Sequence, residues 1–208
     1  MGILEGQLAT ITKNTMKKVM EDKGYAFFEE GDYNLNIIGI RNVSGRADRF
    51  DDNMIVLYKN NGKWMVHSYE ITTEPGHKIL KRPINSKGTA ILIPDQYRGA
   101  YRIGTHKTYT ALIQRGAKVK VWRDDNRDSK PDYKGEEDEG WYGINIHKHA
   151  GSDTREDTGG VSAGCQVFRS SKDFYEFMDL CDIAADTWSN SFTYTLLNSE
   201  DVYKEEKA

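Results

Sequence analysis

The sequence has few cysteines and lacks a long apolar run. Cys165 and Cys181 are its only cysteines, and two thiols in a chain of this length do not make a disulfide framework. No stretch approaches the roughly 20 apolar residues that cross a bilayer. Residues 1–6 also lack the basic segment and apolar core of a signal peptide. We therefore expect free thiols, no membrane span, and a chain made in the cytoplasm without a signal peptide.

An excess of positive charge is also missing. The formal net charge is −3 and the pI is about 6.0, whereas nucleic-acid binding requires clustered Lys and Arg. We therefore expect no nucleic-acid partner. The 208 residues with 38% apolar content suffice for one well-buried core, and they leave the oligomeric state open.

Local patterns predict a mainly β fold of the α+β class. Apolar residues at three- and four-residue steps predict helices over residues 7–23 and 171–185. Runs rich in β-branched and aromatic residues, separated by turn signals, predict strands. These strands are expected at residues 34–40, 53–58, 63–71, 89–93, 101–104, 108–114, 119–123, 141–147 and 192–197.

The order of these elements predicts one main domain with small additions. Residues 1–49 are expected to form an N-terminal helix and a lead-in strand that pack on the main domain. Residues 50–198 are expected to form that domain around an antiparallel, closely turned sheet. Residues 199–208 are polar and are predicted to be a tail.

Residues 123–140 contain eight carboxylates and four basic residues. Such a segment is predicted to be an exposed loop between two strands. A calcium loop is the alternative, but Ser129 and Gly135 stand where such a loop has glycine and glutamate. The candidate oxygen ligands are Asp124, Asn126, Asp128 and Asp132.

A histidine and a cysteine lie at the two ends of a glycine-rich interval. A β-type run ends at His147, fourteen residues separate it from Ser162, and Gly164 and Cys165 follow. A thiol performs acyl transfer as the thiolate, so it needs an imidazole to take its proton and backbone N–H groups to hold the oxyanion. His147 is the candidate base. A glycine at position 164 lets a substrate carbonyl approach the amides of Gly164 and Cys165.

On these residues alone, two other interpretations remain open. Cys165 is also compatible with a core position, with His147 as a hydrogen-bonded residue at the end of a strand. The second interpretation is a zinc site formed by His147, His149 and Cys165. Of the close ligand spacings typical of zinc sites, however, only His-x-His is present. We expect no metal. The remaining histidines are predicted to have structural or surface roles, and His106, which lies in a polar turn near aromatic residues, is the first candidate for an exception.

The same segment resembles the L,D-transpeptidase family, also called YkuD-type. That family has a histidine at the end of a strand, an interval of this length, and then Ser or Thr, His, Gly and the catalytic Cys. Here the pattern reads His147, Ser162, Ala163, Gly164 and Cys165. Weaker matches extend the resemblance over residues 50–168. Two positions depart from the pattern: Ala163 replaces the family's histidine, and Gln166 follows the cysteine in place of an aliphatic residue.

The resemblance implies an L,D-transpeptidase-like β-sandwich that acts on peptidoglycan stem peptides without a cofactor. It implies that His147 deprotonates Cys165, that the thiolate attacks a carbonyl next to a D-amino acid, and that a thioester forms. The amides around Gly164 would hold the oxyanion, and Ser162 would orient the loop or His147. The candidate substrate contacts are His149, His106, Tyr97, Tyr101, Trp141 and Gln166.

An amine that attacks the thioester would make the enzyme a transpeptidase, and water would make it a carboxypeptidase or endopeptidase. The expected lack of a signal peptide favours hydrolysis by a phage lysin or a bacterial effector, which reaches the cell wall after lysis or by specialised delivery. The alternative from another class is a catalytically inactive cell-wall-binding or virion structural module, which Ala163 favours. A cysteine peptidase with a different substrate class is a third interpretation without a motif of its own.

Overall fold

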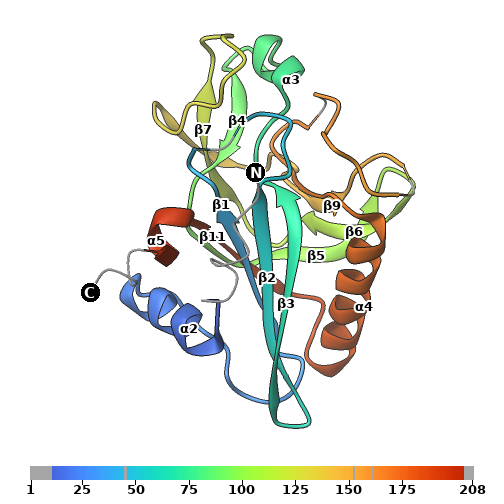
Figure 1. Ribbon diagram of the computed structural model, residues 1–208. Helices are drawn as coiled ribbons and strands as arrows, with labels where there is room; N and C mark the ends of the chain where they lie inside the picture. The colour runs from blue at the N-terminus through green and yellow to red at the C-terminus, as the bar shows by residue number, and fades with distance from the viewer. Residues whose placement is uncertain (1–10, 45, 152, 161, 204–208) are drawn as a thin grey trace.

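The computed structural model describes residues 11–44, 46–151, 153–160 and 162–203, and it is mainly β with a few helices (Figure 1). The strands are β1 (Asn36–Arg41), β2 (Asp52–Asn60), β3 (Lys63–Thr72), β4 (Thr89–Leu92), β5 (Gln96–His106), β6 (Tyr109–Gln114), β7 (Val119–Asp124), β8 (Glu137–Gly140), β9 (Ile146–Lys148), β10 (Gln166–Phe168) and β11 (Phe192–Asn198). The helices are α2 (Lys13–Asp22), α3 (His77–Lys81), α4 (Ser171–Thr187) and α5 (Ser199–Tyr203). The predicted α+β class is confirmed. None of the helices in these ranges is long and apolar enough to span a membrane.

The strands form a closed barrel in the order β1-β11-β5-β6-β9-β10-β3-β2, and a small separate sheet in the order β4-β7-β8. Most neighbours are antiparallel, as expected, but β1 pairs with β11 and β9 pairs with β10 in parallel. The expectation of a wholly antiparallel sheet is therefore wrong at these two places. A parallel pair requires a long connection, and the connection from β9 to β10 carries the segment that ends at Cys165.

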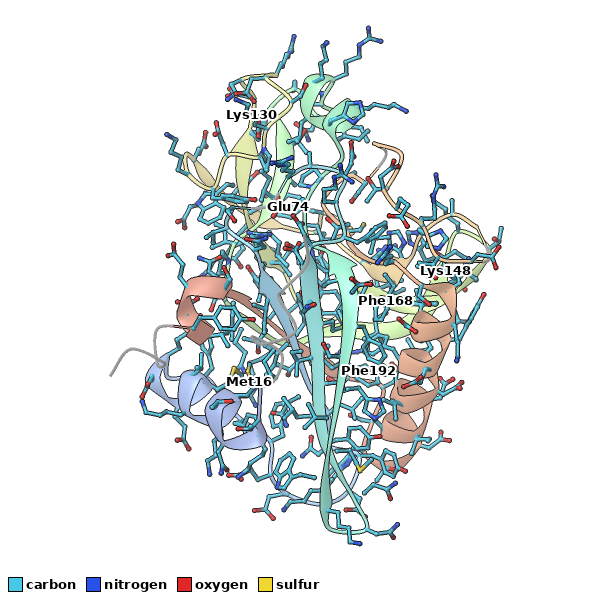
Figure 2. The ribbon with its side chains drawn as sticks, in the orientation of Figure 1. Met16, Glu74, Lys130, Lys148, Phe168 and Phe192 are labelled. Atoms are coloured by element: carbon cyan, nitrogen blue, oxygen red, sulfur yellow. The ribbon has the colours of Figure 1, made fainter. Side chains whose placement is uncertain are left out.

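Helix α4 covers the barrel beside β10. Ser170 caps the helix by accepting a hydrogen bond from the Asp173 amide at 3.2 Å. The buried side chain of Phe168 packs against Phe174 and Phe177 of α4, with ring centroids 5.6 and 5.2 Å apart. Figure 2 shows Phe168 between the barrel and this helix. The packing fixes β10, and with it the residue that precedes β10, Cys165.

Helices α2 and α5, the first and last helices of the described residues, lie together on the other side of the barrel (Figure 1). Thr12 caps α2, and the apolar face predicted from the sequence buries Met16, Val19 and Met20. Residues 7–10 of the predicted helix lie outside the described residues. Residues 199–203, predicted to be part of a polar tail, form α5 and bury Val202.

Residues 123–140 contain a strand that was not predicted, β8, which pairs with β7. Most side chains between the two strands are exposed, as expected. The Asp124 carboxylate accepts a hydrogen bond from the Asp132 amide at 3.0 Å, and Asn126 donates to the Asp132 carboxylate at 2.8 Å. The loop therefore uses these oxygens for its own hydrogen bonds. Within the described ranges, no group of three or more His, Cys, Asp or Glu side chains is placed to hold a metal ion.

A buried ionic network lies where the barrel meets the small sheet. Arg41 Nε lies 2.9 Å from Glu74 Oε1, and both side chains are fully buried. Arg41 also donates to Thr73 and to the Leu92 carbonyl, at 3.0 and 2.8 Å. Asp52 Oδ2 accepts from the amide and the hydroxyl of Thr73. Figure 2 labels Glu74 at this junction. Arg41 thus pairs with the buried Glu74, and the Thr73 hydroxyl links it to the buried Asp52.

This network predicts that the protein loses stability as the pH rises through about 7. Burial, together with the nearby Glu74, raises the pKa of Asp52 to about 7, whereas the unfolded chain has an ordinary value of about 4. The folded state therefore binds this proton more tightly, and the resulting stabilisation is complete below the unfolded pKa and is lost above the folded one.

Thermal unfolding followed by circular dichroism from pH 5 to pH 8 is expected to show a falling Tm for the wild type. Asp52→Asn, which cannot ionise, is expected to flatten this slope. Asp179→Asn, at an exposed position on α4, is the control and is expected to keep the wild-type slope. A wild-type Tm that rises over this range would contradict the assignment.

Candidate active site

Cys165 and His147 are brought together by the parallel pair of β9 and β10. Gln166 lies opposite Ile146, and Val167 opposite His147, so Cys165 lies opposite Asn145. Because side chains alternate between the two faces of a sheet, Asn145, His147 and Cys165 share one face. The two residues singled out by their spacing in the sequence therefore lie on the same side of this strand pair, His147 within β9 and Cys165 immediately before β10.

The Cys165 thiol contacts two backbone groups. Its Sγ donates to the Gly143 carbonyl and accepts from the Asn145 amide, each at 3.5 Å. Burial raises the pKa of the Cys165 thiol, so the protonated form is the resting state. A thiol of this kind requires a base to remove its proton as it reacts.

The segment before β9 is not the strand predicted over residues 141–147. Gln114 Oε1 accepts hydrogen bonds from the amides of Tyr142, Gly143 and Ile144, at 3.1, 2.9 and 3.3 Å. Gly143 has a positive φ of 67°. One side-chain oxygen thus gathers three consecutive amides into a turn, and this turn directs the Gly143 carbonyl to the thiol. The strand begins only at Ile146.

His147 has the geometry of a neutral base. Its Nδ1 lies 2.7 Å from the Lys148 carbonyl, and because a carbonyl only accepts, Nδ1 carries the hydrogen. The Tyr109 hydroxyl donates to the same carbonyl at 3.2 Å. Nε2 therefore keeps a free lone pair. Burial lowers the pKa of His147 to about 4, so the ring is neutral at pH 7. The hydrogen bonds of Sγ and of this ring, as far as the chain is described, do not join the two side chains directly.

Ser162 and Gln166 hold the loop that presents Cys165. The backbone carbonyl of Ser162 accepts a hydrogen bond from the Gly76 amide at 2.8 Å, and the Ser162 hydroxyl accepts one from the Gly164 amide at 3.4 Å. The buried Gln166 side chain donates to the Gly164 carbonyl at 3.2 Å and accepts from the Tyr194 hydroxyl at 2.8 Å. Gln166, a predicted substrate contact, thus supports the loop from below. The Cys165 amide has no acceptor among the described residues.

Gly164 cannot carry a side chain in this loop. Its φ is +105°, and an added Cβ would lie 2.4 Å from the Ala90 carbonyl oxygen. We expect Gly164→Ala to destabilise the fold by about 2 to 4 kcal/mol, because the strain of the positive φ adds to a backbone clash. Urea unfolding measures this loss.

Gly62→Ala is the matched control for this substitution. Gly62 has a φ of +73°, but nothing lies within 4 Å of its added Cβ, so that variant reports the cost of the backbone conformation alone. Equal losses for the two variants would show that the contact with Ala90 does not constrain the loop.

The other predicted substrate contacts are placed differently. His149 is buried, and its two ring nitrogens face the carbonyls of Ala150 and Asp153, so it fastens the loop after β9. The buried Tyr97 donates to the Ile93 carbonyl at 2.6 Å. Tyr101 is fully buried against Tyr194. Trp141 is 54% exposed and, with Ala163, lines a cavity of about 280 Å³ between the small sheet and the cysteine loop.

Three residues of the site were not found from the sequence: Asn145, Tyr109 and Gln114. Asn145 precedes His147 by two positions, and strand alternation is the signal that points to it. Gln114 and Tyr109 act on backbone groups roughly 30 to 40 positions away in the chain, and no local pattern marks such contacts. Comparisons of this chain with protein-family models, with curated proteins and with solved structures found no match.

Proposed function

We propose that this protein is a cysteine-dependent acyl-transfer enzyme that acts on peptidoglycan stem peptides, as the resemblance to L,D-transpeptidases implies. The observation that carries the proposal is the shared face of Cys165 and His147 on two parallel strands. Two features of the described residues support it: His147 Nδ1 faces the Lys148 carbonyl, which leaves Nε2 with the lone pair, and the Cys165 amide has no acceptor among these residues. The same resemblance leads us to propose an L,D-transpeptidase-like arrangement for the barrel and the small sheet.

In this mechanism the proton moves from Cys165 Sγ to His147 Nε2 as the sulfur attacks the substrate carbonyl carbon. The Cys165 amide donates to the oxyanion that forms, and a well-placed donor of this type is worth about 3 kcal/mol. When the intermediate collapses, the C–N bond breaks, and the leaving amine takes the proton from His147. The product is a thioester on Cys165 and a free amine.

The second half of the reaction returns the enzyme to its resting state. His147 takes a proton from the incoming nucleophile, which attacks the thioester, and Cys165 leaves and recovers the proton. We propose that water is the usual nucleophile, so the enzyme is a carboxypeptidase or endopeptidase. An amine from another stem peptide would make it a transpeptidase. We further propose that the protein reaches the cell wall after lysis or by specialised delivery, as a phage lysin or a bacterial effector.

Mass spectrometry of muropeptides tests the proposal. Purified wild type and Cys165→Ala are incubated with muropeptides from a Gram-negative sacculus. Loss of a terminal D-residue, cleavage of a crosslink or exchange of a D-amino acid by the wild type alone is the expected result. Unchanged spectra for both proteins would reject this substrate class.

A catalytically inactive wall-binding module is the second candidate. Two observations favour it: Ala163 stands where the resembled family has a histidine, and burial raises the pKa of the Cys165 thiol. Sedimentation with purified sacculi discriminates between the two. Equal binding of wild type and Cys165→Ala without any product would support the module.

A further inference from the structure

A second histidine lies against the proposed base. His106 ends β5, and its ring stacks on that of His147 with centroids 4.2 Å apart and planes inclined by 16°. Asn145 Nδ2 lies 3.0 Å from His106 Nδ1. His106, His147 and Asn145 thus form a contiguous group. The backbone N–H of Asn145 also donates to the Cys165 sulfur.

The hydrogen bonds of this group fix which ring nitrogen of His106 carries the proton. The backbone N–H of Gln114 can only donate, and it lies 2.9 Å from Asn145 Oδ1. This contact assigns the oxygen of the Asn145 amide, so the Nδ2 group points to His106 and donates. His106 Nδ1 is therefore the acceptor, and the neutral ring carries its hydrogen on Nε2. His147 has the opposite tautomer, with its hydrogen on Nδ1 and its lone pair on Nε2.

The groups around His106 disfavour a positive charge on its ring, because Lys107 beside it is already positive. Lys107 follows it, His147 on β9 covers one face, and Tyr109 on β6 contacts it edge to face, with centroids 5.6 Å apart. The Lys148 ammonium lies 5.1 Å from the centre of the Tyr109 ring. Burial, and then the charge of Lys107, lower the pKa of His106. Its Nε2 is buried without an acceptor among the described residues.

We propose that His106 is a positioning residue for His147, held by Asn145 as the Nε2–H tautomer so that its flat neutral ring fixes the plane of the base. Because Nδ1 of His106 already accepts from Asn145 and its Nε2 carries the hydrogen, His147 is the ring of this stacked pair that accepts the proton of Cys165. The role of His147 as a base rests on the proposed function, whereas the tautomers and the stack do not.

Nitrogen NMR of the imidazole rings tests the tautomers on the wild-type protein. Long-range ¹H–¹⁵N correlations at pH 7 distinguish Nδ1–H from Nε2–H rings. We expect a pure Nε2–H form for His106 and a pure Nδ1–H form for His147. His67 is the reference ring for assignment. It lies outside this group, where it stacks on Tyr58 and Tyr69 and contacts Glu176. A His106 ring in the Nδ1–H form, or in rapid exchange between forms, would overturn the proposal.

Two substitutions at His106 separate positioning from substrate contact. His106→Phe keeps a flat ring without nitrogens, and His106→Ala removes the ring. The readouts are the pH profile of Cys165 alkylation by iodoacetamide and, for muropeptides, kcat and KM. Loss of the stack is expected to slow alkylation at pH 7 by about tenfold in His106→Ala, equivalent to a shift of one pKa unit. It is also expected to lower kcat with little change in KM, and His106→Phe is expected to stay within about threefold of the wild type.

Other patterns in these variants would contradict the proposal. Equal losses in His106→Phe and His106→Ala would assign a hydrogen-bonding role to the His106 nitrogens. A loss of thermal stability with an unchanged alkylation profile would assign a structural role. His67→Ala is the control, because it removes a stacked histidine outside the site, and it is expected to leave alkylation unchanged. If muropeptides are not processed but alkylation still depends on His106, the positioning role stands and the proposed substrate falls.

Discussion

Replacing Cys165 by alanine is expected to lower the turnover of muropeptides by at least about 10⁴-fold, because a lost nucleophile removes the whole covalent route. Folding should be nearly unaffected, since the hydrogen bonds of the sulfur to described residues go only to the backbone groups of Gly143 and Asn145, at 3.5 Å. We expect the free energy of unfolding to change by less than about 1 kcal/mol. Mass spectrometry of the products measures turnover, and urea unfolding measures the free energy of unfolding.

Cys181→Ala is the matched control for this variant. Cys181 is fully buried in α4, so its loss is expected to cost about 1 kcal/mol of stability and to leave turnover unchanged. Turnover that survives in Cys165→Ala, or that falls equally in Cys181→Ala, would remove Cys165 from the mechanism.

Replacing Arg41 by methionine is expected to lower the free energy of unfolding by about 3 to 5 kcal/mol, because it leaves Glu74 buried without its cation and removes the Thr73 link to Asp52. The loss should be larger at pH 8 than at pH 5, since both carboxyl groups have raised pKa values and Glu74, whose pKa Arg41 lowers, takes up a proton more readily when Arg41 is absent. Urea unfolding at the two pH values provides the measurement.

Arg169→Met is the control for the buried network. Arg169 pairs with Glu70 and Glu156 at the surface, at 2.7 and 3.0 Å, and a pair of that kind contributes at most about 1 kcal/mol. Similar losses for the two arginine variants would show that burial of the Arg41 network adds nothing to its effect. The double variant Arg41→Met with Glu74→Leu is expected to recover part of the stability, because it removes one of the uncompensated charges.

Much of the fold follows from local patterns. Runs of β-branched and aromatic residues bounded by turn signals predicted β2, β3 and β6 within a few positions, because such residues favour strands and these strands pair over long registers. Strand β8 was missed because Glu137, Asp138 and Glu139 read as a solvated loop, and only pairing with β7 makes them a strand. The parallel pairs were missed because strand direction depends on connections that carry no local signal.

The sequence likewise predicted one part of the candidate site and missed another. The spacing from His147 to Cys165 predicted that the two residues meet, and the structure places them on one face of neighbouring strands. The sequence did not reveal how Asn145, Gln114 and His106 are joined, because their contacts link β5, β6 and the turn before β9. Gln166 was assigned to substrate because it follows the cysteine, but a strand residue next to an outward position points inward, and Gln166 binds Tyr194.

Trapping the acyl-enzyme tests the central claim most directly. Wild type and His147→Gln are mixed with a tetrapeptide stem, quenched in acid after short times, digested and analysed by mass spectrometry. We predict a thioester adduct on the peptide that contains Cys165, formed at least about 100-fold more slowly in His147→Gln, because general-base catalysis contributes about 10² to 10⁴-fold. The absence of an adduct on Cys165 at all quench times, while product accumulates in the wild type, would contradict a covalent mechanism through this cysteine.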